Sequence, residues 1–103
     1  MTPRPKHTKP DANQAQIVAD LRDLGAVVWI LADLGGEVLD LMVFWRGLAI
    51  PVEVKRSGCE HIITDGEHES MVALEGVGIP YAIATCAEDV LRVFEELEEA
   101  RGA

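Results

Sequence analysis

Two acidic residues interrupt segments of the sequence that are otherwise apolar. Asp40 stands within Leu39–Phe44, and Glu53 stands within Ile50–Lys55. An ionised carboxylate near a protein core is tolerated chiefly when it is paired, hydrogen-bonded or bound to a cation. Because side chains alternate along a strand, Glu53 and Lys55 share one face of their segment. These residues are therefore the first candidates for chemistry.

The chemistry that such residues support is metal-assisted hydrolysis of a phosphodiester. Two carboxylates held close together repel each other, and a divalent cation between them removes that repulsion. Oxygen ligands suit a hard ion such as Mg²⁺ or Mn²⁺, and the carbonyl of Val54 is a further candidate ligand. Such an ion polarises a phosphate oxygen and makes a water molecule more acidic. The ammonium of Lys55 can then orient the attacking water or stabilise charge at phosphorus.

A simpler interpretation of the same residues is an exposed strand that carries alternating charges. A Glu-x-Lys triplet arises by chance in many chains, and edge strands often carry charges that discourage aggregation. The context favours a site instead. Asp40 and Glu53 both lie in apolar strands that one hairpin joins, and Lys55 is the only basic residue placed to neutralise them.

The elements before and around these residues predict how they meet. Asp11 and Gln14 form a capping pattern for a first helix, which Gly25 ends. Segments rich in Val, Ile and Trp then predict three strands in an antiparallel meander: Ala26–Leu31, Leu39–Trp45 and Leu48–Lys55. The dipeptide Arg46-Gly47 predicts a hairpin that places Asp40 beside Glu53.

The second half of the chain predicts two helices with a strand between them. Thr64 with Glu67 and Thr85 with Glu88 each form a capping box, and Tyr81–Ala84 is strand-like. A right-handed crossover lays this strand parallel to the third one. We therefore expect an α/β fold of order αβββαβα, with a mixed central sheet flanked by helices.

Length and composition predict one compact domain. The 103 residues are 49% apolar and 26% charged, which is typical of a globular protein with a single core. Residues 1–10 are rich in proline and basic residues, so we expect a flexible basic arm followed by a single domain over residues 11–103. Cys59 and Cys86 suit reduced thiols. Without an apolar segment of membrane-spanning length, a cytoplasmic protein is expected.

The net charge of −9 argues against an extended surface for nucleic acid, since such surfaces are usually basic. The charge is uneven, however, because the acidic residues crowd the last helix. Two alternatives follow from this acidity: a nuclease-like fold that binds or regulates without cutting, and an acidic inhibitor that mimics DNA. A DNA mimic has no need of Lys55 between strand carboxylates.

The chain resembles the PD-(D/E)XK nuclease superfamily, specifically the virus-type replication-repair nuclease (VRR-NUC) branch in its short, stand-alone form from phages and prophages. The resemblance covers about residues 11–100 and is carried by the helical opening Asp11–Val18, the turn Gly35-Gly36, Asp40–Val43, Glu53–Lys55 and the capped helix after Thr64. Two positions depart from the family pattern. Leu39 stands where proline normally precedes the aspartate, and Gln16 stands where the first helix often carries an acidic residue.

The resemblance implies a restriction-endonuclease-like core, Mg²⁺ or Mn²⁺ as cofactor, and DNA as substrate. Residue by residue, it implies that Asp40 and Glu53 are metal ligands and that Lys55 is the catalytic lysine. Stand-alone members resemble junction-resolving or other structure-selective endonucleases that act as homodimers, which suits paired cuts.

Several further residues are weighed for supporting roles. Gln14 and Gln16 could reach the site from the first helix or could serve as ordinary solvent residues, and the sequence does not decide. Glu67 and Glu69 could face the site from the second helix, but a solvated face of that helix is the favoured interpretation. Trp29 and Trp45 lie in strands and are expected to be buried in the core or in a dimer interface. The candidates for holding DNA phosphates are Arg4, Lys6, Lys9, Arg46 and Arg56.

Overall fold

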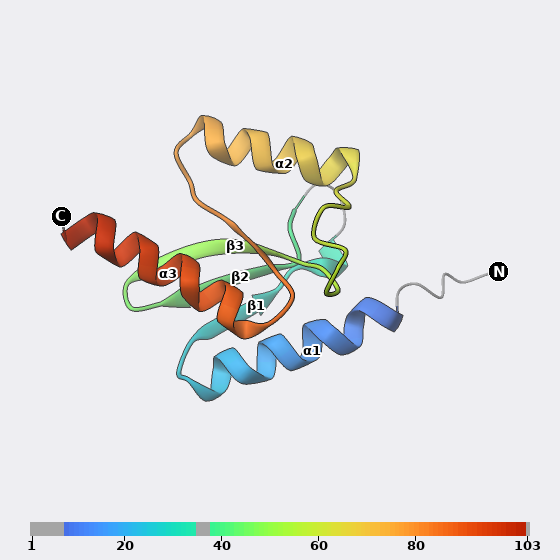
Figure 1. Cartoon of the computed structure of the whole chain (residues 1–103), viewed down its shortest axis with the longest axis horizontal. Helices are drawn as coiled ribbons and strands as arrows, with labels where there is room; N and C mark the ends of the chain where they lie inside the picture. The colour runs from blue at the N-terminus through green and yellow to red at the C-terminus, as the bar shows by residue number, and fades with distance from the viewer. Residues whose placement is uncertain (1–7, 35–37, 103) are drawn as a thin grey trace.

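A four-stranded sheet and three α-helices make up the fold (Figure 1). The computed structural model describes residues 8–34 and 38–102, and describes residues 8–12 by their backbone alone. The elements in chain order are α1 Thr8–Asp23, β1 Val27–Ile30, the short 3₁₀ turn η2 Ala32–Leu34, β2 Leu41–Trp45, β3 Leu48–Val54, α2 Asp65–Gly76, β4 Ala82–Ala84 and α3 Ala87–Gly102. None of the helices in these ranges has the length and apolar composition needed to cross a bilayer.

The sheet is mixed, as the sequence predicts. Its strand order is β1-β2-β3-β4, with antiparallel pairs β1–β2 and β2–β3 and a parallel pair β3–β4. The β2–β3 hairpin turns at Arg46 and Gly47, whose φ angles of 53° and 77° are both positive, as a type I′ turn requires. The predicted α/β class and the parallel fourth strand are confirmed.

One face of the sheet carries the main core. Helices α1 and α3 pack against each other and against this face, which Figure 1 shows on the side opposite α2. The core consists mainly of fully buried aliphatic side chains around Phe94, including Ile17, Leu21, Leu41, Val43, Ile50, Val52 and Val90. Burying a large apolar side chain contributes about 1.5–3 kcal/mol, so this face supplies most of the stability.

The other face of the sheet is covered by α2 alone (Figure 1). Helix α2 begins with the predicted capping box, since Thr64 and Glu67 exchange both hydrogen bonds. Met71 is the only residue of α2 that is buried. A cleft of about 460 Å³ with a mostly apolar lining that includes Met42, Pro51 and Leu74 lies between α2 and the sheet. Helix α2 therefore packs much less tightly than α1 and α3.

Three features at the ends of elements differ from the sequence prediction. Helix α1 begins at Thr8 and not at Asp11, because Pro10 lies in the first turn, where a missing N–H costs no hydrogen bond. Residues 1–7 of the predicted arm, and the predicted Gly35-Gly36 turn, lie outside the described residues. Asp40 precedes β2 and is not inside it. Thr85 bonds to Asp89 and not to Glu88, since α3 begins at Ala87, one residue later than the predicted cap allows.

The two tryptophans lie in different environments. Trp45 is half-buried and packs edge-on against Phe94, with 5.7 Å between the ring centroids. Trp29 is 58% exposed and packs only one edge on Phe44, at 4.7 Å. Trp29 therefore does not lie in the core, because β1 is an edge strand that α2 does not cover, and its alternative place in a dimer interface stays a prediction.

Candidate active site

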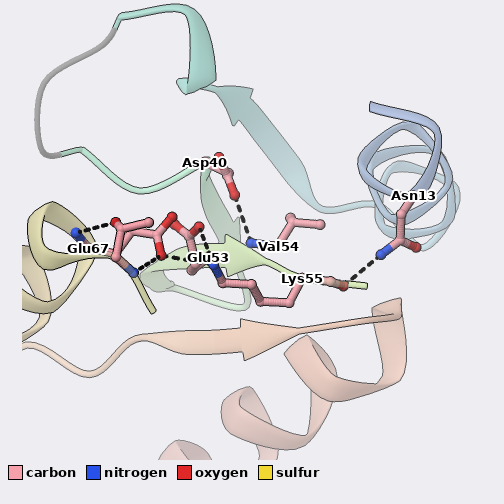
Figure 2. A network of polar contacts seen from close by, with 7 residues as sticks. Asn13, Asp40, Glu53, Val54, Lys55 and Glu67 are labelled. Atoms are coloured by element: carbon pink, nitrogen blue, oxygen red, sulfur yellow. Dashed lines mark hydrogen bonds and ion pairs between the residues drawn. The ribbon is translucent and has the colours of Figure 1, made fainter. Parts of the chain in front are cut away.

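Asp40, Glu53 and Lys55 meet where β2 begins and β3 ends (Figure 2). The β2–β3 ladder stops at the pair Leu41–Val52. Beyond that pair, the contact between the two strands is made by the Asp40 side chain. Its Oδ2 accepts a hydrogen bond of 2.8 Å from the N–H of Val54, in place of a backbone carbonyl. The hairpin thus fixes the first carboxylate against the strand that carries the other two residues.

Glu53 is the most constrained member of the site. Its side chain lies on the α2 face of β3, and its backbone is paired with Ile83 of β4, one residue beyond the last pair with β2. Only 4% of its surface is exposed, and among residues 13–34 and 38–102, whose side chains the structure describes, it is the one buried charged or polar residue. A carboxylate held this deeply requires a proton, a cation or several donors.

Lys55 bridges the two neighbouring glutamates. Its Nζ lies 2.8 Å from Oε1 of Glu67 and 3.7 Å from Oε2 of Glu53, and its side chain is only 12% exposed. Figure 2 shows the Lys55 side chain running along β3 toward Glu67. The expectation that Glu67 faces solvent is therefore wrong, whereas Glu69 is exposed as expected.

The acidic groups outnumber the single ammonium. Asp40, Glu53 and Glu67 carry three negative charges when ionised, against one positive charge on Lys55, which leaves a surplus of two negative charges. Burial raises the pKa of Glu53 to about 9, and its hydrogen bond with Glu67 and the charge of Asp40 add to that shift. In the absence of a cation, Glu53 therefore keeps its proton at neutral pH.

The pKa values of the other two carboxyl groups move in opposite directions. Burial raises the pKa of Asp40, although the hydrogen bond from Val54 opposes that shift. Burial of Glu67 also disfavours its charged form, but hydrogen bonds with Glu53 and Lys55 outweigh burial, so the pKa of Glu67 is lowered. Glu67 is thus the ionised partner of Lys55, and Glu53 is the protonated neighbour.

Asn13 of α1 holds the end of β3 from the side of the sheet opposite α2. Its Nδ2 donates a hydrogen bond of 2.8 Å to the carbonyl of Lys55, across 42 residues of sequence. The N–H of Lys55 donates to the carbonyl of Ala84 on β4. Both backbone groups of Lys55 are therefore held. The sequence offers no signal for Asn13, because one polar residue in a helical opening is ordinarily a capping or solvent residue.

The two glutamines proposed as supporting residues lie elsewhere on α1. Gln16 is exposed and donates to Asp20 one turn further along the helix. Gln14 lines a shallow hollow with Arg22 and Ile30 beside strand β1. In the described part of the chain, neither glutamine makes a hydrogen bond to the site carboxylates, so α1 contributes Asn13 in their place.

The candidate phosphate-binding residues are scattered. Arg56 is exposed and directly follows Lys55, so it lies at the rim of the site. Arg46 lies at the other end of β2, roughly 20 Å from Asp40 by strand length, and pairs with Glu98 at 3.3 Å. Lys6, and the side chain of Lys9, lie outside the described residues.

Metal binding here would depend on two side chains and the backbone. Within the described ranges, no group of three or more His, Cys, Asp or Glu side chains has the arrangement of a metal cluster. Asp40 and Glu53 are the two carboxylates, and the carbonyl of Val54 points to the Asp40 side of β3, as its N–H does. Mg²⁺ commonly binds through one or two carboxylates and keeps several waters. The donor set therefore fits Mg²⁺ better than an ion that needs a full protein cage.

Comparisons with protein-family models, with curated proteins and with solved structures give no match to this chain.

Proposed function

We propose that this protein is a divalent-metal-dependent endonuclease that hydrolyses phosphodiester bonds in DNA, with Asp40, Glu53 and Lys55 as its active-site residues. The observation that carries the proposal is the burial of the Glu53 carboxyl group beside Asp40 and Lys55. A structural role gives no reason to retain a buried carboxyl group with a pKa of about 9. A cation site does, because a divalent ion balances the two surplus negative charges.

Asp40 and Glu53 would hold Mg²⁺ or Mn²⁺, with the carbonyl of Val54 as a further ligand. The bound ion would supply charge neutralisation at the phosphodiester and would make the attacking water more acidic. Asp40 is already fixed by the N–H of Val54, so only its second oxygen needs to face the ion. Glu53 must lose its proton before it can bind, which makes metal binding favourable at higher pH.

Lys55 would act directly on the substrate. Its ammonium has three donors, and Glu67 takes one of them at 2.8 Å. The remaining donors would bind a phosphate oxygen or the attacking water molecule. A positive charge fixed at this point stabilises the negative charge that grows on the phosphate during attack.

The finer features of the proposal come from the resemblance to the VRR-NUC nucleases. It implies a restriction-endonuclease-like core, a phage or prophage origin, and preference for branched DNA such as a four-way junction. It also implies a homodimer, which the exposed apolar side chains of β1, among them Val27, Trp29 and Ile30, would support if they form part of the interface. An area of exposed apolar side chains commonly marks such contacts.

The test is cleavage of supercoiled plasmid, a four-way junction and single-stranded DNA by the purified protein with Mg²⁺ or Mn²⁺. We expect cleavage by the wild type and a loss of at least about 10³-fold for Asp40→Ala, because removing a ligand removes the ion that neutralises the reacting phosphate. Glu69→Gln serves as a control, since it removes an exposed carboxylate from α2.

Binding of DNA without cleavage under every metal condition would contradict the proposal and would favour the non-cutting binding module. A thermal shift separates these outcomes from misfolding. The wild type should gain stability with Mg²⁺ or Mn²⁺ because a ligand that binds only the folded state stabilises it. Asp40→Ala should fold and should lose that gain, whereas a DNA mimic should be indifferent to either metal.

A further inference from the structure

One oxygen of Glu67 joins the start of helix α2 to the side chain of Lys55. Oε1 of Glu67 accepts a hydrogen bond of 3.0 Å from the N–H of Thr64 and another of 2.8 Å from Nζ of Lys55. The backbone N–H of Glu67 serves only the helix cap, because it donates a hydrogen bond of 3.2 Å to Oγ1 of Thr64. A residue whose position the sequence explains by helix capping thus also contacts the proposed catalytic lysine.

We propose that Glu67 is a positioning residue for the cleavage reaction, which holds the ammonium of Lys55 beside Glu53; this inference rests on the proposed function. A lysine side chain is a flexible chain of four carbons, and fixing it in one conformation costs about 2 kcal/mol of rotamer entropy. The backbone of Lys55 is held by Asn13 and Ala84, but these contacts leave its side chain free. The direction of the ammonium therefore depends on what its donors bind.

Among the residues that the structure describes, Glu67 is the one side chain that hydrogen-bonds the ammonium of Lys55. Glu53 lies at 3.7 Å, which is within ion-pair distance but too long for a hydrogen bond. One oxygen of Asp40 accepts a hydrogen bond from the N–H of Val54, and Asp40 acts on Lys55 only through its charge. Removing the charge of Glu67 should consequently release the ammonium, even though Glu53 stays in place.

Because α2 packs loosely on the sheet, the contact between Glu67 and Lys55 matters more for where the helix and the lysine lie relative to each other. Met71 is the only buried side chain of α2, and an apolar cleft lies between the sheet and the C-terminal half of the helix, at Ser70, Ala73 and Leu74. The ion pair between Lys55 and Glu67 is only partly exposed, at 12% and 23%, so solvent screens it less than a surface pair. The pair fixes the start of α2 and the end of Lys55 relative to each other.

The experiment compares Glu67→Gln with two matched controls on the same helix. Gln keeps the capping box, because a glutamine at this position also reaches back to the cap, but it replaces a charge-assisted hydrogen bond with one about half as strong. Thr64→Ala breaks the cap and leaves the carboxylate of Glu67 in place. Glu69→Gln removes one exposed negative charge two residues away.

In cleavage assays with saturating Mg²⁺, we expect kcat of Glu67→Gln to fall about 10- to 100-fold with KM nearly unchanged, because a charge-assisted contact that positions a reacting group acts on the chemical step. Thr64→Ala should lower the melting temperature and keep kcat within about 3-fold of the wild type, because a lost cap costs about 1 kcal/mol of stability and does not reach Lys55. Equal loss of kcat in Thr64→Ala and Glu67→Gln would overturn the inference in favour of a purely structural role.

A measurement that requires no cleavage decides the same question. The chain contains only three lysines, Lys6, Lys9 and Lys55, so lysine ammonium groups labelled with ¹⁵N give few signals by NMR. We expect one signal with slowed hydrogen exchange, identified by its loss in Lys55→Arg, retained in Thr64→Ala and Glu69→Gln, and absent in Glu67→Gln.

The two readouts separate the inference from the proposed function. If the wild type cuts no DNA but the protected lysine signal depends on Glu67, the proposed function fails and the positioning of Lys55 stands. If the wild type cuts and Glu67→Gln keeps both full kcat and the protected signal, the proposed function stands and the role of Glu67 is wrong.

Discussion

The two faces of the sheet use the same strands for different purposes. On the α1 and α3 face, fully buried aliphatic residues surround Phe94. On the α2 face, the strands present Glu53 and Lys55, an apolar cleft and the exposed ring of Trp29. Because side chains alternate along a strand, a single seven-residue strand, β3, serves both faces.

The difference shows how so small a chain can hold a buried carboxylate. Glu53 is buried on the α2 face, which contributes little to the core, whereas the α1 and α3 face supplies most of the stability. A cation or a substrate that binds on the loosely packed α2 side, as proposed, would leave Phe94 and its neighbours undisturbed. The following predictions test this division from the largest expected effect to the smallest.

The largest effect on stability should come from the α1 and α3 face. Phe94→Ala should lower the free energy of unfolding by about 3–5 kcal/mol, because it leaves a cavity in a fully buried site. Leu74→Ala, in the lining of the α2 cleft, should cost about 1 kcal/mol, since much of its surface already borders open space. Urea denaturation followed by circular dichroism measures both. Equal losses would show that α2 is as much a part of the core as α3.

The next effect, which is smaller when it is expressed for each pH unit, is a pH dependence that comes from Glu53. Its folded pKa of about 9 exceeds its ordinary value of 4.5, so the folded protein keeps a proton that the unfolded chain releases in this range. The free energy of unfolding should therefore be highest near pH 5 and should fall toward pH 9, by up to about 1.4 kcal/mol per pH unit. Urea denaturation at several pH values in the presence of a chelator measures the slope.

Glu53→Gln is the variant that isolates this slope. It should remove most of the decline between pH 5 and pH 9 and should be more stable than the wild type at pH 9 without metal. Glu67 does not obscure the comparison, since its lowered pKa reduces stability only as pH falls below about 4.5. A Glu53→Gln protein with the wild-type slope would show that Glu53 is ionised in the folded state.

The smallest effect concerns the two tryptophans, one on each face. Trp45→Ala should cost about 2 kcal/mol because it loses the edge contact with Phe94. Trp29→Ala should cost less than about 1 kcal/mol, because more than half of its surface is already exposed. Denaturation of both variants at low protein concentration checks this order. A larger loss for Trp29 that grows with protein concentration would instead place Trp29 in a dimer interface.

The sequence predicts the main parts of the fold because its local signals agree with one another. The capping box of Thr64 and Glu67, the Arg46-Gly47 hairpin and the parallel fourth strand all follow from local patterns and a handedness rule, and all are confirmed. The meeting of Asp40 with β3 also follows, because the hairpin register brings them together.

The remaining features depend on contacts that no local pattern contains. Asn13 reaches Lys55 across 42 residues, and whether α1 presents Asn13 or Gln14 to β3 depends on how the helix is rotated on the sheet. Glu67 has a sufficient local explanation as a capping residue, which conceals its second contact with Lys55. Trp29 is exposed because α2 covers only part of its face, which depends on tertiary packing.

The most direct test of the central claim is the conversion of supercoiled plasmid to nicked and linear forms by the wild type and by Lys55→Ala, each with Mn²⁺ and with a chelator. Lys55→Ala should keep the metal-dependent gain in melting temperature, since Asp40 and Glu53 remain. The account predicts cleavage only by the wild type and only with metal. Cleavage by Lys55→Ala at the wild-type rate, or cleavage in the presence of the chelator, would contradict it.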